Sequence, residues 1–114
     1  MTIDQHLDYD VINNLKDIMD GDFTFLIETY FQDSTNRITA LRNAVAIKDG
    51  DNIRRAAHSF KGSCSNLGAL RLASLCAALE QSGVQGNFAS IDNDIDVLEQ
   101  EYNVVKGMLQ EFLQ

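Results

Sequence analysis

One histidine stands among side chains that could hold an anionic group. Lys61 and Gly62 follow His58 by three and four residues. Arg54 and Arg55 precede it by four and three residues. In a helix, at about 100° per residue, these five positions fall within about 120° of one another. Nearby cations disfavour the imidazolium, so a neutral, nucleophilic nitrogen is kept available near pH 7. The pattern predicts a histidine that accepts an anion-bearing group.

Gly62 is the second unusual feature of this stretch. Glycine inside a helix costs about 0.5–1 kcal/mol relative to alanine, so its position one turn after His58 needs a reason. A missing side chain at this point lets another backbone approach the imidazole. Ser59 and Ser65 are further candidate contacts for such a partner. The alternative is a solvated surface histidine without a function.

The elements that must position these residues are helices. Proline is absent, and apolar residues recur at steps of three and four in five segments, which are 11–19, 22–45, 51–67, 70–82 and 88–112. The second segment is either one long helix or two helices broken near residues 33–35. The pattern predicts an all-α fold, an antiparallel up-down four-helix bundle, with a short N-terminal helix between Asp4 and Met19 as a lid.

Turn and cap residues mark the ends of these helices. We expect Asp51 to cap the third segment, and Gly68 and Gly83 to end the third and fourth segments. The stripes contain two tyrosines, Tyr30 and Tyr102, whose hydroxyls we expect near the bundle surface.

Composition narrows the class of protein. A chain of 114 residues is the usual size of one domain, so we expect a single domain over residues 1–114. The net charge of −8 disfavours binding to nucleic acid or to an anionic membrane surface. Cys64 and Cys76 are too few for a disulfide framework or a zinc site, so we expect reduced core thiols and no metal. We expect a monomer in the cytoplasm, and we assign no function to His6, in a polar N-terminal arm.

The charge is unevenly distributed. No Asp or Glu occurs between Asn52 and Leu79, whereas this stretch contains four cations, Arg54, Arg55, Lys61 and Arg71. We call these four residues the basic island. It is either a recognition surface for an acidic partner or an accident of charge placement on solvated helices.

The run from Ala56 to Ser63, AAHSFKGS, resembles the H-x-x-K-G-[SA] signature of histidine-containing phosphotransfer (HPt) domains. The following residues, CSNLGA and then Leu72, Leu75, Cys76, Leu79 and Glu80, extend the resemblance, which covers the whole chain. It implies a four-helix bundle that carries a phosphoryl group on His58. Its partners would be receiver domains of hybrid sensor kinases and response regulators, with Mg²⁺ supplied by the receiver and no cofactor of its own.

The resemblance also implies roles for the neighbours. Lys61, with Arg54 or Arg55, would balance the charge of the phosphorylated ring, and Gly62, Ser59 and Ser65 would contact the partner. The domain would be a phosphoryl carrier without kinase activity. Two alternatives are a histidine kinase dimerisation module, which typically has an acidic residue after the histidine and a proline downstream, and a non-phosphorylated adaptor that binds receiver domains. Here Ser59 follows His58 and proline is absent.

Overall fold

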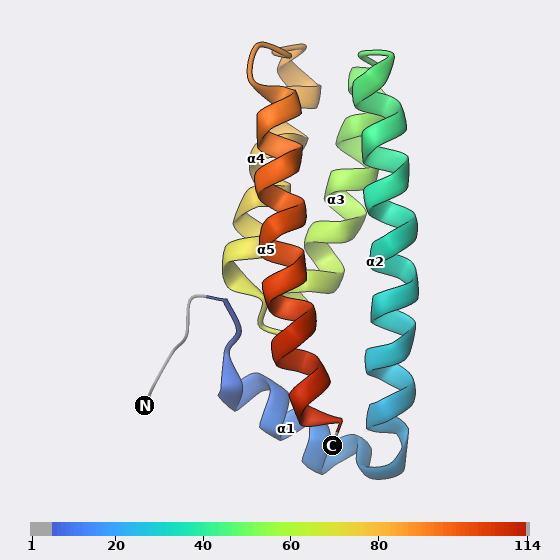
Figure 1. Ribbon diagram of the computed structural model, residues 1–114, viewed down its shortest axis with the longest axis vertical. Coiled ribbons are helices and arrows are strands. Elements are labelled where there is room, and N and C mark those ends of the chain that lie inside the picture. The colour runs from blue at the N-terminus through green and yellow to red at the C-terminus, as the bar shows by residue number, and fades with distance from the viewer. Residues whose placement is uncertain (1–5, 114) are drawn as a thin grey trace.

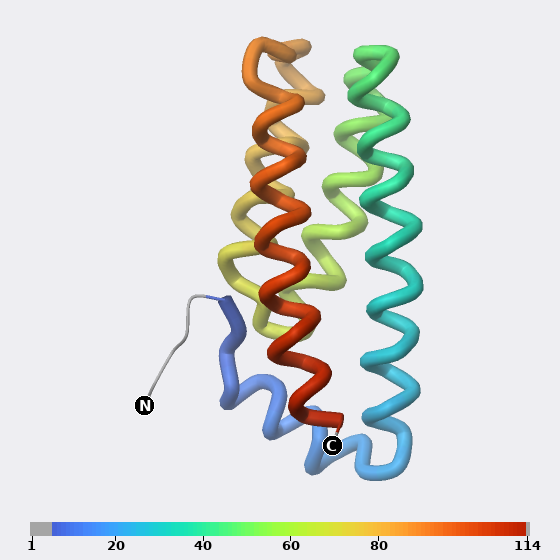
Figure 2. The backbone as a smooth tube through the Cα atoms, in the orientation of Figure 1, coloured from blue at the N-terminus to red at the C-terminus, as the bar shows by residue number. Residues whose placement is uncertain are grey.

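The chain folds into four long helices and a shorter one that crosses their end. The structure is a computed structural model that describes residues 6–113, and within them no strand occurs. Figures 1 and 2 show that the four long helices alternate in direction along the molecule, which measures 42 × 27 × 19 Å. This confirms the predicted antiparallel up-down four-helix bundle. The helices are α1 (Tyr9–Met19), α2 (Phe23–Ala46), α3 (Gly50–Asn66), α4 (Leu70–Gln85) and α5 (Ile91–Phe112), with a 3₁₀ turn at Asp20–Asp22.

Unequal helix lengths explain the place of α1. The 24 residues of α2 and 22 of α5 outreach the 17 of α3 and 16 of α4, by about 10 Å at a rise of 1.5 Å per residue. Helix α1 crosses the end of the bundle that α3 and α4 leave open (Figure 1). Leu7 and Ile12 are fully buried there. The lid is confirmed, although Asp4 lies outside the described residues and Ile18, counted with the apolar stripe, is exposed.

The turn between α3 and α4 holds the segment that precedes α1. Gly68 has a φ of +75°, and a Cβ there would lie 2.9 Å from the Cβ of Asp8. The Asp8 amide donates to the Gly68 carbonyl at 2.8 Å. Gly68 therefore ends α3 as predicted, and it also allows the lid segment to lie directly on the turn.

Helix α2 is continuous. The sequence left open a break near residues 33–35, but the core stripe passes through Ser34, which is 1% exposed. Thr35 bonds back to the carbonyl of Phe31 at 3.1 Å, within the helical geometry. The alternative of two helices is therefore wrong.

Two predicted boundary residues have other roles. Helix α3 begins at Gly50, so Asp49 rather than Asp51 is the N-cap, and its carboxylate accepts from the Asn52 amide at 3.2 Å. Asp51 instead lies in the first turn. Helix α4 continues through Gly83, because this glycine faces Gly50 on α3, where a Cβ would come 2.6 Å from the Gly50 carbonyl oxygen. Gly86, at φ +65°, ends the helix.

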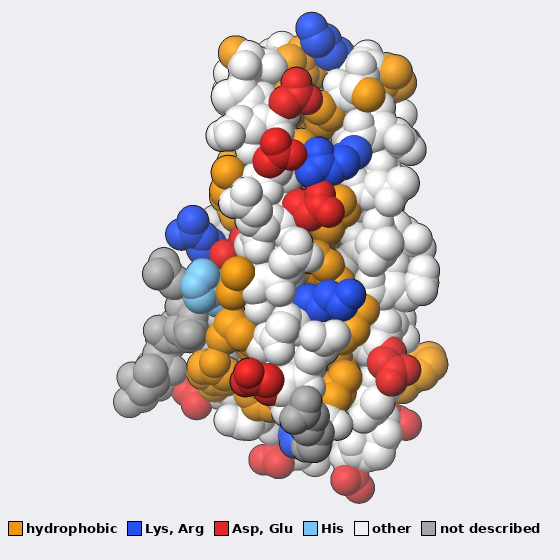
Figure 3. Space-filling view, viewed as in Figure 1, with side chains coloured by type: hydrophobic (Ala, Val, Ile, Leu, Met, Phe, Trp, Pro, Cys, Tyr) orange, Lys and Arg blue, Asp and Glu red, His pale blue; other side chains and the backbone are white. Residues whose placement is uncertain are grey.

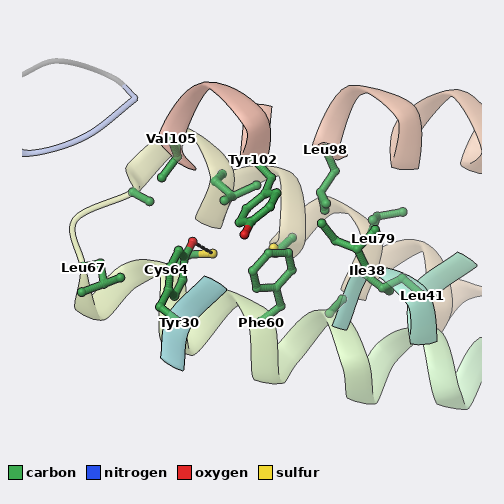
Figure 4. Close-up of a cluster of buried hydrophobic side chains, with 14 of the residues drawn as sticks. Tyr30, Ile38, Leu41, Phe60, Cys64, Leu67, Leu79, Leu98, Tyr102 and Val105 are labelled. Carbon is green, nitrogen blue, oxygen red and sulfur yellow. Dashed lines mark hydrogen bonds between the residues drawn. The ribbon is translucent and has the colours of Figure 1, made fainter. Parts of the chain in front are cut away.

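The two tyrosines lie inside the bundle (Figure 4). The Tyr30 hydroxyl and the Cys64 sulfur hydrogen-bond at 3.3 Å, and burial raises the pKa of Tyr30. The Tyr102 hydroxyl is buried without a hydrogen-bond partner in residues 6–113. The expectation of hydroxyls near the surface is thus wrong, because the Tyr102 ring packs between Tyr30 and Phe60 inside the bundle. Cys64 and Cys76 are free and buried, as predicted.

In the part of the chain that the structure describes, no helix is long and apolar enough to cross a membrane.

Candidate functional site

Helix α3 presents His58 on its outer side. Ala57, Phe60 and Cys64 on the same helix are fully buried. They fix the face that α3 turns toward the core, so the imidazole must point away from it. The side chain of His58 is 65% exposed. The sequence prediction of an outward histidine is consistent with this geometry.

A carboxylate from the neighbouring helix holds both His58 and Lys61. Glu80 lies on α4, and its Oε2 is 2.9 Å from His58 Nδ1. Its Oε1 accepts a hydrogen bond from Lys61 Nζ at 2.6 Å. We call His58, Lys61 and Glu80 the histidine cluster. Sequence reasoning assigned no role to Glu80, although this residue is the first acid after Asp51 and directly follows the core residue Leu79.

The contact with Glu80 determines which ring nitrogen is available. A carboxylate only accepts hydrogen bonds, so the proton of a neutral His58 must sit on Nδ1. The hydrogen bond from Lys61, followed by that from His58, holds the pKa of Glu80 below its ordinary value, which keeps it ionised at neutral pH. Nε2, on the other edge of the ring, then carries the free lone pair.

Gly62 leaves open space beside the imidazole. It is exposed, and a Cβ built on it would meet nothing within 4 Å. Neither packing nor a left-handed backbone therefore requires a glycine at this point of α3. The geometry agrees with a need for clearance above the helix, one turn from His58.

The arginines of the predicted site are not part of the histidine cluster. Arg54 Nη2 and Arg55 Nε contact the two carboxylate oxygens of Asp51 at 3.0 and 2.8 Å. The hydrogen bond from Arg54 leads the interactions that lower the pKa of Asp51. Both pairs point along α3 toward its N-terminus, away from the turn that contains Lys61.

The basic island is therefore balanced by carboxylates in space. Lys61 pairs with Glu80, and Arg71 Nε lies 3.4 Å from Glu101 Oε1. Arg54 and Arg55 pair with Asp51, so each of the four cations has a carboxylate partner. All of these carboxylates lie outside the acid-free stretch. Pairing in the free protein leaves both interpretations of the basic island open, because exposed pairs of this kind can be exchanged for those with a partner.

The two serines flank the histidine without fixed contacts. Ser65 is exposed and Ser59 is half-buried. Neither side chain makes a hydrogen bond to another described residue. The structure brings them near His58 along α3 but assigns them no task in the unbound protein.

His6 has a structural contact that the sequence did not indicate. Its Nδ1 lies 2.7 Å from Oε2 of Glu101, a carboxylate that is only 5% exposed. Arg71 lies on the other oxygen of the same carboxylate. This arrangement ties the segment before α1 to α4 and α5.

Metal ligation has no support in the described side chains. Among residues 6–113, no group of three or more His, Cys, Asp and Glu residues could hold a metal ion. The histidine cluster contains one imidazole and one carboxylate, and the ammonium of Lys61 occupies the second carboxylate oxygen.

Comparison with known proteins decides the family. The model of the Hpt domain matches residues 26–114. The chain belongs to the Hpt domain family. Hpt proteins are phosphoryl carriers of phosphorelays, and they interact with receiver domains of response regulators. The match includes all of α3, α4 and α5 and most of α2, whereas α1 lies before it.

A solved Hpt structure has the same architecture. The crystal structure of histidine-containing phosphotransfer protein B (HptB) from Pseudomonas aeruginosa PAO1 aligns with a TM-score of 0.90 and 34% sequence identity. The alignment covers 93% of this chain and 92% of that chain. No curated protein sequence matches the chain. The resemblance seen in the sequence is confirmed at the level of the family and the fold.

Proposed function

We propose that this Hpt domain carries its phosphoryl group on Nε2 of His58. The donor is the aspartyl phosphate of a receiver domain in a hybrid sensor kinase, and the acceptor is the aspartate of a response regulator. The observation that carries the proposal is the contact between Glu80 Oε2 and His58 Nδ1 at 2.9 Å. It orients an exposed imidazole and leaves Nε2 as the nucleophile.

The transfer balances without an additional reactant. The Nε2 lone pair of His58 attacks phosphorus, the N–P bond forms, and the P–O bond to the receiver aspartate breaks to release a carboxylate. The imidazole retains its Nδ1 proton and gains positive charge. Glu80 already accepts that proton in a hydrogen bond, so its negative charge stabilises the phosphorylated ring. Transfer to the second receiver is the reverse of this step.

The ammonium group of Lys61 stabilises the negative charge of the phosphoryl group. In the free protein its ammonium is held by Glu80 Oε1 at 2.6 Å. Since it lies three residues after His58 on the same helix, it is within reach of phosphoryl oxygens on Nε2. The two arginines, each bound to Asp51, are in a weaker position for this role.

The receiver domain supplies the other groups that phosphoryl transfer needs. Phosphoryl transfer requires positioning and charge stabilisation, and Mg²⁺ in the receiver would provide the charge that this domain does not. We therefore propose a carrier without kinase activity or a cofactor of its own. A monomeric state and a cytoplasmic location stay predictions.

Label transfer from phosphorylated receiver domains tests this function. We expect the parent protein to take an acid-labile, alkali-stable label, and His58→Gln to take none. His6→Gln is the matched control, since His6 is the other of the two histidines in the sequence, and it should be labelled like the parent. A His58→Gln variant that still accepts label would refute the assignment.

A further inference from the structure

A groove lined by two arginines lies between α2 and α3, outside the histidine cluster. It encloses about 340 Å³. We call it the α2–α3 groove. Six of the residues that line it, three from α2 and its C-terminal end and three from α3, are Arg37, Asn43, Ile47, Asn52, Arg55 and Ala56.

The chemistry of the α2–α3 groove is that of a carboxylate receptor. Two guanidinium groups and two carboxamides line it together with three alanines and Ile47, and none of its lining residues is acidic. This absence is notable in a protein of net charge −8. The Asn52 carboxamide already donates to Asp49 Oδ2 at 2.7 Å, so the donors for an incoming anion are the two guanidinium groups and the Asn43 carboxamide. Guanidinium matches the geometry of a carboxylate. A second hollow between α2 and α3 differs, because Asp33 lines it and no cation does.

Both arginines are available to an incoming anion. Within residues 6–113, Arg37 makes no ion pair. Arg55 pairs with Asp51, but both side chains are largely exposed, at 68% and 58%. An exposed pair of this kind contributes little to stability, so a partner carboxylate can replace Asp51 at small cost.

The α2–α3 groove begins beside the phosphorylation site. Arg55 precedes His58 by three residues, so their Cβ atoms are neighbours at about 5–6 Å on one helix. Glu80 holds the imidazole from the α4 side, whereas the groove opens on the α2 side. A domain seated over His58 and Gly62 therefore reaches the groove without leaving the surface of α3.

We propose that the α2–α3 groove takes an acidic side chain of the receiver domain that docks on His58. This inference rests on the proposed function and extends it to partner selection. Arg37, which lies on α2 outside the signature around His58, then discriminates between receivers according to whether they place a carboxylate at this position. Charge complementarity of this kind acts on affinity and specificity more than on the chemical step.

The rate of phosphoryl transfer, measured at increasing concentrations of a phosphorylated receiver domain, tests the groove. For Arg37→Gln we expect KM for the receiver to rise roughly tenfold, with the rate at saturating receiver within about twofold of the parent. Arg42→Gln is the control, since it removes the same charge from the same helix on the α5 side. It should change neither quantity.

A charge exchange makes the test specific. Arg37→Glu should weaken transfer further, and one Asp→Arg or Glu→Arg variant of the receiver should restore it. An unchanged KM in both Arg37 variants, or the absence of any restoring receiver variant, would overturn the groove as a receiver contact. Concentration-dependent self-association of the parent that Arg37→Gln abolishes would also overturn it, by making a second copy the occupant.

Failure of the proposed function would be visible separately. Phosphoramidate, a small phosphoryl donor, reaches His58 without a docked receiver. If neither a phosphorylated receiver nor phosphoramidate labels the parent protein, the phosphotransfer assignment fails. If both label it and Arg37 variants behave like the parent, only the groove inference fails.

Discussion

Two of the ion clusters that join neighbouring helices of this bundle differ in what they leave free. The histidine cluster joins α3 and α4 through Glu80. A second cluster joins α2 and α5, where Arg42 contacts Asp96 at 2.9 Å and Glu99 at 2.6 Å. Figure 3 shows the face that α2 and α5 form, with acidic and basic side chains gathered along it.

In the α2–α5 cluster, every charged group has a partner within the cluster. One permanent cation is shared by two carboxylates, and the hydrogen bond with Glu99 leads the interactions that raise the pKa of Arg42. Both carboxylates are engaged by the guanidinium, and the cluster contains no imidazole. In the histidine cluster one carboxylate is shared by two nitrogen groups, and the imidazole has a second nitrogen. The histidine cluster differs from the α2–α5 cluster in two ways. Its imidazole has a nitrogen with a free lone pair, and the open space at Gly62 lets a partner approach it.

Removing the charge of Glu80 should have the largest effect among the neighbours of His58. A hydrogen bond to a charged group is worth about 1.5–3 kcal/mol, so we expect Glu80→Gln to slow transfer roughly 10- to 100-fold. Stopped-flow transfer from a phosphorylated receiver measures this. Glu99→Gln removes the same charge from the α2–α5 cluster and should leave transfer within about twofold. Equal rates in the parent and Glu80→Gln would remove the distinction between the two clusters.

A large side chain at Gly62 should act on the approach of the partner. Gly62→Gln is expected to slow transfer about tenfold, because the added atoms stand between the imidazole and the receiver. Gly107 on α5 is the matched control, since a Cβ there also meets nothing within 4 Å. Gly107→Gln should transfer at the parent rate.

The alanine variants complete the glycine comparison. Gly62→Ala and Gly107→Ala should each raise the free energy of unfolding by up to about 1 kcal/mol through helix propensity, as measured by chemical denaturation. A loss of stability in Gly62→Ala alone would show that Gly62 serves the packing of α3 rather than access to His58.

Acid should weaken the link between α3 and α4 by a small amount. The pKa of Glu80 is lower in the folded protein than its ordinary 4.5, so its contribution is full above pH 4.5 and is lost as pH falls below that value. The difference in unfolding free energy between the parent and Glu80→Gln is expected to be at most about 1 kcal/mol at pH 7 and to shrink toward pH 3. A difference that is constant over this range would contradict an ionised Glu80 as its source.

The sequence predicted most of the fold because the helices are defined by their own periodicity. The stripe through Ile27, Tyr30 and Leu41 requires only the 3.6-residue repeat, and the outward direction of His58 follows from the inward direction of Phe60 on the same helix. What the sequence missed lies between helices. Glu80 meets His58 across 22 residues of chain, and no local pattern reports this distance.

The same limit explains the errors. Gly83 looked like a helix end because glycine commonly ends helices, but its contact with Gly50 on another helix determines its role. The pairs of Lys61 and Arg71 were also missed, because the carboxylates of Glu80 and Glu101 come from beyond the acid-free stretch. A single chain segment carries its own periodicity and charge, whereas pairing across helices needs the packed structure.

Glu80 holds Nδ1 of His58 in a hydrogen bond and leaves Nε2 free to accept the phosphoryl group. Long-range ¹H–¹⁵N and ³¹P NMR spectra of the protein, labelled by a phosphorylated receiver domain, identify the bonded nitrogen directly. We predict a single N–P bond at Nε2 of His58, with the proton retained on Nδ1. A bond at Nδ1, which would require the ring to leave Glu80, or a phosphoryl group on any other residue, would contradict this account.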